Sequence, residues 1–149
     1  MYKHLIVAVD GSTTSMNALR HAAGLAAIDK TAQLTLVTVA NPSEFMSLHE
    51  NYEAAAISQG NEVLAVAETA ARELGVENVN VHLLLANKGV KEMAQGLVGY
   101  ADEINADLLV LGTHGRSGLI HLLMGSFAET VMRQTHLPLL VIRSKADDE

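Results

Sequence analysis

The sequence contains no cysteine, and this absence excludes several classes of protein. A disulfide scaffold, a thiolate zinc site, an iron–sulfur cluster and a cysteine nucleophile all need residues that the chain lacks. Tryptophan is also missing, and aromatic residues make up only 3% of the 149 residues. The apolar residues, 49% of the chain, are therefore mostly aliphatic, which suits helices packed closely on a sheet better than an aromatic-rich sandwich.

Positive charge and long apolar runs are scarce as well. The chain has 10 Lys and Arg against 17 Asp and Glu, a formal net charge of −7. Nucleic acid backbones need a cationic protein surface, so we expect no nucleic acid partner. No stretch approaches the roughly 20 apolar residues of a membrane span, and Leu5–Val9 is too short for a signal peptide. We expect a soluble cytoplasmic protein that does not bind membranes.

Length and composition favour one folded domain. With 49% apolar and 18% charged residues, the chain has the composition of an ordinary globular protein. We expect residues 1–143 to form this domain and residues 144–149 to form an acidic C-terminal tail.

Short β-branched runs alternate with longer segments of helical periodicity. The clearest helix spans Val90 to Ile104, where apolar residues recur at i, i+3, i+4, i+7 and i+8. Strands are predicted at Leu5–Val9, Leu34–Val39, Val79–Leu85, Leu108–Leu111 and Leu139–Ile142. Further helices are predicted after N-caps at Ser12–Thr14, over Val63–Leu74 with Gly75 closing it, and from about Ser126 to Arg133. The connection Asn41–Asn51 is expected to be a mobile flap.

This alternation predicts an α/β fold with one open parallel sheet and helices on both faces. Leu5–Val9 and Leu108–Leu111 are unbroken apolar runs, as is typical of central strands. Val79–Leu85 alternates apolar and polar residues, which places it at an edge. We therefore predict a Rossmann-like, single-domain, five-stranded sheet in the order 3-2-1-4-5.

The order of the strands predicts where a ligand would bind. In open α/β sheets, ligands lie beyond the carboxyl ends of the strands where the strand order reverses, here between the first and fourth strands. The loop after the first strand reads Val9-Asp10-Gly11-Ser12. The loop after the fourth contains three glycines between Gly112 and Gly118, and Gly125 precedes Ser126 at the last helix.

These glycines form a pattern typical of a phosphate cradle. Glycine lets backbone N–H groups crowd around an anion, and the helix that begins near Gly125 adds unpaired N–H groups and a positive dipole end. The alternative is a tight strand–helix turn capped by Ser126. The spacing matches neither the Walker motif nor the dinucleotide GxGxxG pattern, which disfavours P-loop hydrolases and Rossmann dehydrogenases.

The spacing Gly112-x2-Gly115-x9-Gly125-Ser126, together with Val9-Asp10-Gly11-Ser12, resembles the ATP-binding branch of the universal stress protein family. The resemblance extends over nearly the whole chain, although many relatives carry proline where Ala8 stands. It implies an adenine near Ala8, Val9 and Val39, with Asp10 and Ser12 bordering the nucleotide. It also implies that ribose and phosphates contact Gly112, Thr113, His114, Gly115, Arg116, Gly125, Ser126 and Phe127.

Individual residues leave alternatives open. Asp10 either caps the following helix or, beside a phosphate cradle, bonds a ribose hydroxyl or a hydrated Mg²⁺. We expect ATP as the cofactor, with Mg²⁺ or Mn²⁺ held by Asp10. His114 is interpreted as a loop imidazole that bonds the backbone or a phosphate oxygen, and Arg116 either binds phosphate or is solvated. The remaining histidines are scattered, so a zinc site is not expected.

The expected function is a nucleotide-dependent regulatory or stress-response role. Hydrolysis is expected to be slow or absent, since no residue is evidently placed to orient an attacking water. One alternative is an ATPase or a phosphoryl or adenylyl transferase that uses His114, Arg116 and Asp10. Another is a chaperone-like scaffold dimer with a structural nucleotide. We also expect a homodimer through the last strand, Leu139–Ile142, because an exposed apolar edge strand favours pairing and the family resemblance implies it.

Overall fold

The computed structural model describes residues 2–47, 50–113 and 125–143. Within these ranges strands and helices alternate as the sequence predicts. The elements are β1 (His4–Ala8), α1 (Thr13–Ala27), β2 (Gln33–Ala40), the 3-10 helix η1 (Pro42–Phe45), α2 (Tyr52–Glu73), β3 (Asn78–Leu85), α3 (Val90–Glu103), β4 (Leu108–Gly112), α4 (Ser126–Gln134) and β5 (Leu139–Ile142). None of the described helices is long and apolar enough to cross a membrane.

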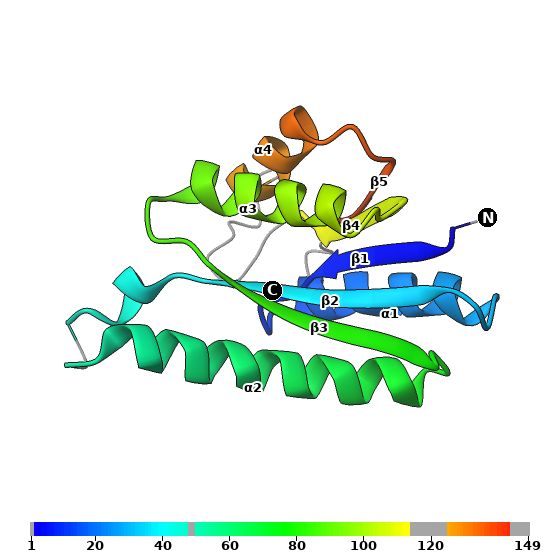
Figure 1. Ribbon diagram of the computed structural model, residues 1–149, viewed down its shortest axis with the longest axis horizontal. Helices are drawn as coiled ribbons and strands as arrows, with labels where there is room; N and C mark the ends of the chain where they lie inside the picture. The colour runs from blue at the N-terminus through cyan, green and yellow to red at the C-terminus, as the bar shows by residue number, and fades with distance from the viewer. Residues whose placement is uncertain (1, 48–49, 114–124, 144–149) are drawn as a thin grey trace.

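The strands form one sheet in the order β3-β2-β1-β4-β5, which confirms the predicted topology (Figure 1). All neighbouring strands are parallel. β1 lies in the centre between β2 and β4, and β3 and β5 form the two edges. The chain order therefore reverses between β1 and β4, at the point where the sequence places the ligand crevice.

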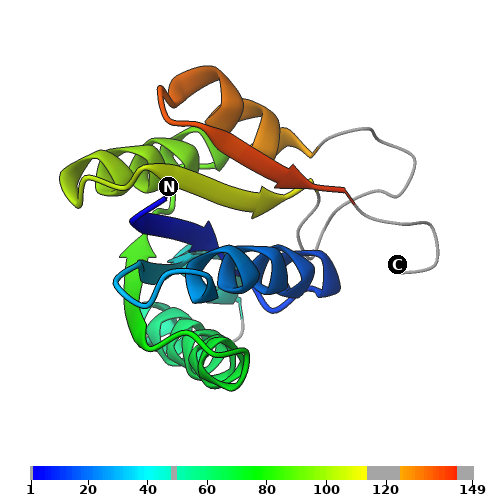
Figure 2. The same cartoon turned by 90° about the vertical axis from the view of Figure 1, so that its right-hand side faces the viewer.

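Helices cover both faces of the sheet, α1 and α2 one face and α3 and α4 the other (Figure 2). Successive residues of a strand point to opposite faces, so each central strand contributes to two cores. Leu5 and Val7 of β1 pack with the α1 and α2 core, whereas Ile6 packs with the α3 and α4 core. All three side chains are fully buried, in agreement with the unbroken apolar run.

Small residues bring α2 very close to the sheet. Ala56, Ala67 and Ala71 are buried against it. At Gly60 a Cβ atom would lie 2.5 Å from Leu83 Cδ1, closer than real Cβ atoms approach. Gly60 is therefore a glycine because α2 packs directly on β3, not because a turn requires it.

The helix ends follow the sequence signals in most places. Ser12 is the N-cap of α1, and its side chain accepts a hydrogen bond from the Ser15 N–H group. Gly75 follows α2 with a φ of +99°, the left-handed conformation expected of a residue that closes a helix. α2 begins at Tyr52, well before the predicted start. Part of the expected flap is the helix η1, in which Pro42 is buried.

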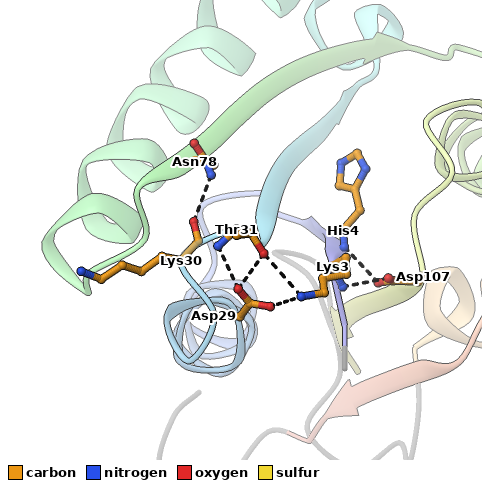
Figure 3. A network of polar contacts seen from close by, with 7 residues as sticks. All are labelled: Lys3, His4, Asp29, Lys30, Thr31, Asn78 and Asp107. Atoms are coloured by element: carbon orange, nitrogen blue, oxygen red, sulfur yellow. Dashed lines mark hydrogen bonds and ion pairs between the residues drawn. The ribbon is translucent and has the colours of Figure 1, made fainter.

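Polar contacts tie together the beginnings of three strands (Figure 3). The Asp107 carboxylate, just before β4, accepts hydrogen bonds from the backbone N–H groups of Lys3 (2.8 Å) and His4 (3.1 Å) at the start of β1. The Lys3 ammonium pairs with Asp29, which also accepts from Thr31 before β2. The hydrogen bond from Lys3, reinforced by Thr31, holds the pKa of Asp29 well below its usual range.

Candidate functional site

The ends of β1 and β4 lie side by side at the carboxyl end of the sheet, because the two strands are parallel neighbours. The closest approach joins Gly112, at the end of β4, to Thr14 in the first turn of α1. A Cβ atom on Gly112 would lie 2.5 Å from Thr14 Cγ2 and 3.3 Å from the Thr14 carbonyl carbon. Gly112 therefore lets α1 begin directly against the end of β4.

Asp10 lies in a local network that shapes the loop after β1. Its carboxylate accepts a hydrogen bond from the Ser12 N–H group at 2.9 Å, and its own N–H group donates to Ser15 Oγ at 3.2 Å. Gly11 between them has a φ of +85°, which favours glycine. The carboxylate of Asp10 braces the turn, while Ser12 and not Asp10 provides the N-cap of α1.

Among the described residues, no side chain caps the N-terminus of α4. Its N-cap is Gly125, whose φ of −71° and ψ of 159° are ordinary extended values. The Gly125 N–H group donates to the Thr113 carbonyl at 2.6 Å, so it is not available to an anion. The next N–H groups, of Ser126, Phe127 and Ala128, have no partner within the helix because they belong to its first turn. The N-cap of α4 is Gly125, so the predicted cap by Ser126 is wrong.

Thr113 and Phe127 both contact neighbouring parts of the fold. Thr113 is buried, and its N–H group donates to the Ile142 carbonyl of β5 at 2.9 Å. Phe127 is partly buried against the core under α3 and α4. Ser126 is exposed at the start of α4. The backbone of Thr113 thus joins β4, β5 and the start of α4 at one point.

The residues expected near an adenine lie on different sides of the sheet. Val9 is only 2% exposed and belongs to the core under α1 and α2, and its N–H group donates to the Val37 carbonyl at 2.8 Å. Ala8 points to the opposite core. Val39, at the end of β2, is half-buried. A ligand could therefore contact Val9 through its backbone, not through its side chain.

A small cavity lies next to Asp10, between the end of β2, η1 and α2. Its volume of about 20 Å³ is enough for one water molecule and not for a nucleotide base. Sequence reasoning identified Asp10 and Val39 in its wall and missed the others: Thr38, Ala40, Asn41, Glu44, Phe45, Ala56, Gln59, Gly60 and Val63. Two sequence features could have identified these residues: Asn41-Pro42, which is typical of a capped turn, and Gly60 inside a helix.

Three predicted site residues, His114, Gly115 and Arg116, lie outside the described residues. Among the residues that are described, no three His, Asp or Glu side chains are grouped so as to hold a metal ion. A magnesium site built on one carboxylate still fits Asp10, because Mg²⁺ is commonly held by one or two carboxylates together with substrate phosphates and water.

Comparisons with known proteins agree with the fold. The model of the universal stress protein family matches residues 1–143. The chain is similar to a universal stress protein of Methanocaldococcus jannaschii, with 33% identity over 148 residues that cover 96% of this chain and 83% of the relative.

Two similar solved structures contain nucleotides. One is a universal stress protein in complex with cAMP, with 26% identity, a TM-score of 0.70 and coverage of 97% of this chain and 98% of that chain. The other is the universal stress protein from Archaeoglobus fulgidus in complex with dAMP, with 25% identity, a TM-score of 0.71 and coverage of 95% and 98%.

Proposed function

Because the chain belongs to the universal stress protein family, we propose that it binds ATP with a divalent cation between β1 and β4. Nucleotide binding regulates the protein, and hydrolysis is slow or absent. The complexes of two relatives with cAMP and dAMP support an adenine nucleotide as the ligand. The choice of ATP depends on the glycine spacing Gly112-x2-Gly115-x9-Gly125-Ser126.

The observation that carries this proposal is the uncapped N-terminus of α4 at the point where the strand order reverses. First-turn N–H groups and the positive end of the helix dipole together favour an anion. At α1 the corresponding position is filled by the Ser12 side chain, whereas Gly125 has no side chain to fill it at α4.

Asp10 supplies the negative charge for the cation. Its carboxylate lies on the loop beside β4, and the hydrogen bond from the Ser12 N–H group fixes its orientation. One Asp10 oxygen together with ATP phosphates and water would complete the coordination of Mg²⁺ or Mn²⁺. The cation would neutralise phosphate charge next to an acidic side chain.

The adenine base and the ribose would contact different residues from the cation. The backbone of Ala8 and Val9 and the exposed part of Val39 would contact the adenine at the ends of β1 and β2. The ribose and phosphates would lie beside Gly112, Thr113, Ser126 and Phe127, with Ser12 at the edge of the site. His114, Gly115 and Arg116 would complete the phosphate contacts.

The experiment begins with the purified protein. With no Trp and three Tyr, the chain absorbs weakly, so a retained nucleotide would dominate the ultraviolet spectrum. Denaturation followed by mass spectrometry identifies any ligand released, and calorimetry with ATP in Mg²⁺ and in a chelator measures affinity. No ATP binding at any metal concentration would overturn the proposal.

The same preparation separates the alternative functions. A burst of product in single-turnover kinetics would favour an ATPase or transferase. Suppression of aggregation that does not depend on nucleotide would favour a scaffold. Nucleotide binding without either result is the outcome expected of a regulatory protein.

We further propose a homodimer through β5. All four residues, Leu139–Ile142, remain half-buried at the edge of the sheet beside β4. Leu140 and Ile142 pack toward one core, and Leu139 and Val141 toward the other, so apolar side chains are partly exposed on both faces. Pairing with a second β5 would cover both the backbone edge and these side chains.

A further inference from the structure

The second edge of the sheet, β3, exposes a defined set of backbone groups. In parallel strands both polar groups of one residue point to the same neighbour. The Ala86 N–H group, just after β3, donates to the Ala40 carbonyl of β2 at 3.0 Å. The even-numbered residues of β3 therefore point their N–H and C=O groups toward β2. The odd-numbered residues of β3, among them Val81, Leu83 and Leu85, therefore point their N–H and C=O groups away from the sheet.

Arg72 covers the beginning of this edge. Its guanidinium donates to the carbonyls of Glu77 at 3.2 Å and Val79 at 3.4 Å. Two further hydrogen bonds, at 3.0 and 3.2 Å, hold it on Glu68 of the same helix. Charged side chains commonly protect sheet edges from pairing. The Arg72 side chain does not cover the backbone edge from Val81 to Leu85.

The open segment also exposes apolar side chains. Val81 is 43% exposed and Leu85 44%, and both lie on the same face of the strand as Leu83. Alternating backbone donors and acceptors beside apolar side chains fit another extended strand better than a polar loop or a helix.

We propose that this segment pairs with the β3 strand of a second copy, antiparallel, about a two-fold axis at Leu83. Leu83 then exchanges two hydrogen bonds with its symmetry mate, and each Val81 exchanges two with a Leu85, since such pairs bond reciprocally in antiparallel strands. Opposed residues point to one face, so the exposed Val81 side chain packs on Leu85 of the other copy.

The position of α2 fits this partner. α2 packs over β2 and β3 alike, so its axis lies about one strand spacing of ~4.8 Å from the two-fold axis. The α2 axes of the two copies would then be about 9.6 Å apart, inside the usual range of roughly 8–10 Å for packed helices. Neither copy has to move its helix to let the strands pair.

The flank of α2 that would form this helix contact is a shallow groove, lined by Ala54, Ile57, Ser58, Asn61, Glu62 and Ala65. Ala54, Ser58, Asn61 and Ala65 continue the line of Glu68 and Arg72 by helical spacing. Gly60 packs on Leu83, so Asn61 would lie near the two-fold axis. Residues at equal distances from Asn61 would then meet, which brings Ile57 opposite Ala65.

Charge is complementary at the ends of the proposed ladder. Glu77 lies six residues before Leu83 and Lys88 five residues after it, and both side chains are exposed. Antiparallel pairing brings Glu77 of one copy to about the level of Lys88 of the other, twice in each dimer.

Cysteine cross-linking tests the register, because the chain has no cysteine of its own. Opposed Cα atoms would be about 5.5 Å apart, which a disulfide can bridge. In one strand, positions 81 and 85 are roughly 13 Å apart, too far for an internal disulfide. The test uses V81C, L85C and the double variant, all carrying V141D so that β5 does not contribute.

Under mild oxidation of nucleotide-free protein, we expect the double variant to form a covalent dimer. A mixture of V81C and L85C should also form one, and neither single variant should do so alone. A double variant that stays monomeric, or single variants that cross-link equally well, would overturn the proposal. Circular dichroism checks folding, and since no nucleotide is present, a negative result leaves the ATP site untouched.

Discussion

Replacing Gly125 with aspartate should raise the stability of the ligand-free protein and lower its affinity for ATP. The φ of −71° and ψ of 159° at Gly125 suit any residue, so aspartate causes no backbone strain there. Aspartate is a better N-cap than glycine by a few tenths of a kcal/mol, and its charge gains roughly 0.3–1 kcal/mol from the helix dipole. We expect a net gain of about 0.5 kcal/mol, or about 1–2 °C in Tm.

The same carboxylate would occupy the place proposed for phosphate. It would accept hydrogen bonds from the first-turn N–H groups of α4 in place of the phosphate, and its charge would repel the phosphate. We expect ATP affinity to fall at least tenfold, which corresponds to about 1.4 kcal/mol. A merely structural Gly125 could not give higher stability together with lower affinity.

Two further variants complete this test. G125V keeps the first-turn N–H groups of α4 but places a branched side chain beside them, so the affinity for ATP should fall at least about tenfold. Its ligand-free Tm should fall by roughly 2–4 °C because valine is a poor N-cap. G24D adds the same charge on α1, where a Cβ atom would meet nothing within 4 Å, and should bind ATP normally.

Calorimetry with ATP and thermal unfolding without it measure the two effects separately. Normal ATP binding by G125D would refute the assignment of the start of α4 to phosphate. Loss of folding in G125D would refute the reading of the Gly125 backbone as unstrained.

Three other predictions concern the cation, the dimer and acid stability. D10A should weaken ATP binding in Mg²⁺ by roughly 1–3 kcal/mol, and equal calorimetric affinities in both proteins would contradict the role of Asp10. V141D should convert a dimer to a monomer in light scattering, and an unchanged mass would exclude β5 as the interface. Since the pKa of Asp29 is lowered on folding, its pairing with Lys3 stabilises at neutral pH and is lost as pH falls below about 4. Unfolding curves of D29N should lack this part of the acid sensitivity.

The sequence by itself determined the topology and the point at which the strand order reverses. The apolar run around Leu5–Val9 identified a strand buried on both faces, and the alternation over Val79–Leu85 identified an edge strand, as the structure confirms. Ser12 and Gly75 likewise marked helix ends correctly. These features depend on neighbours within one strand or one helical turn, so the local pattern of residues is enough to predict them.

Only the tertiary structure decided what several site residues do. Gly112 is small because Thr14 lies against it, and Gly60 because Leu83 does, although a phosphate cradle offered another reason for Gly112. The side chain of Val9 is buried in the core, and α2 and η1 line the cavity beside Asp10. Each of these facts is a distance between separate elements. Such distances depend on how α1, α2 and the strands pack on one another, which spacing along the chain does not specify.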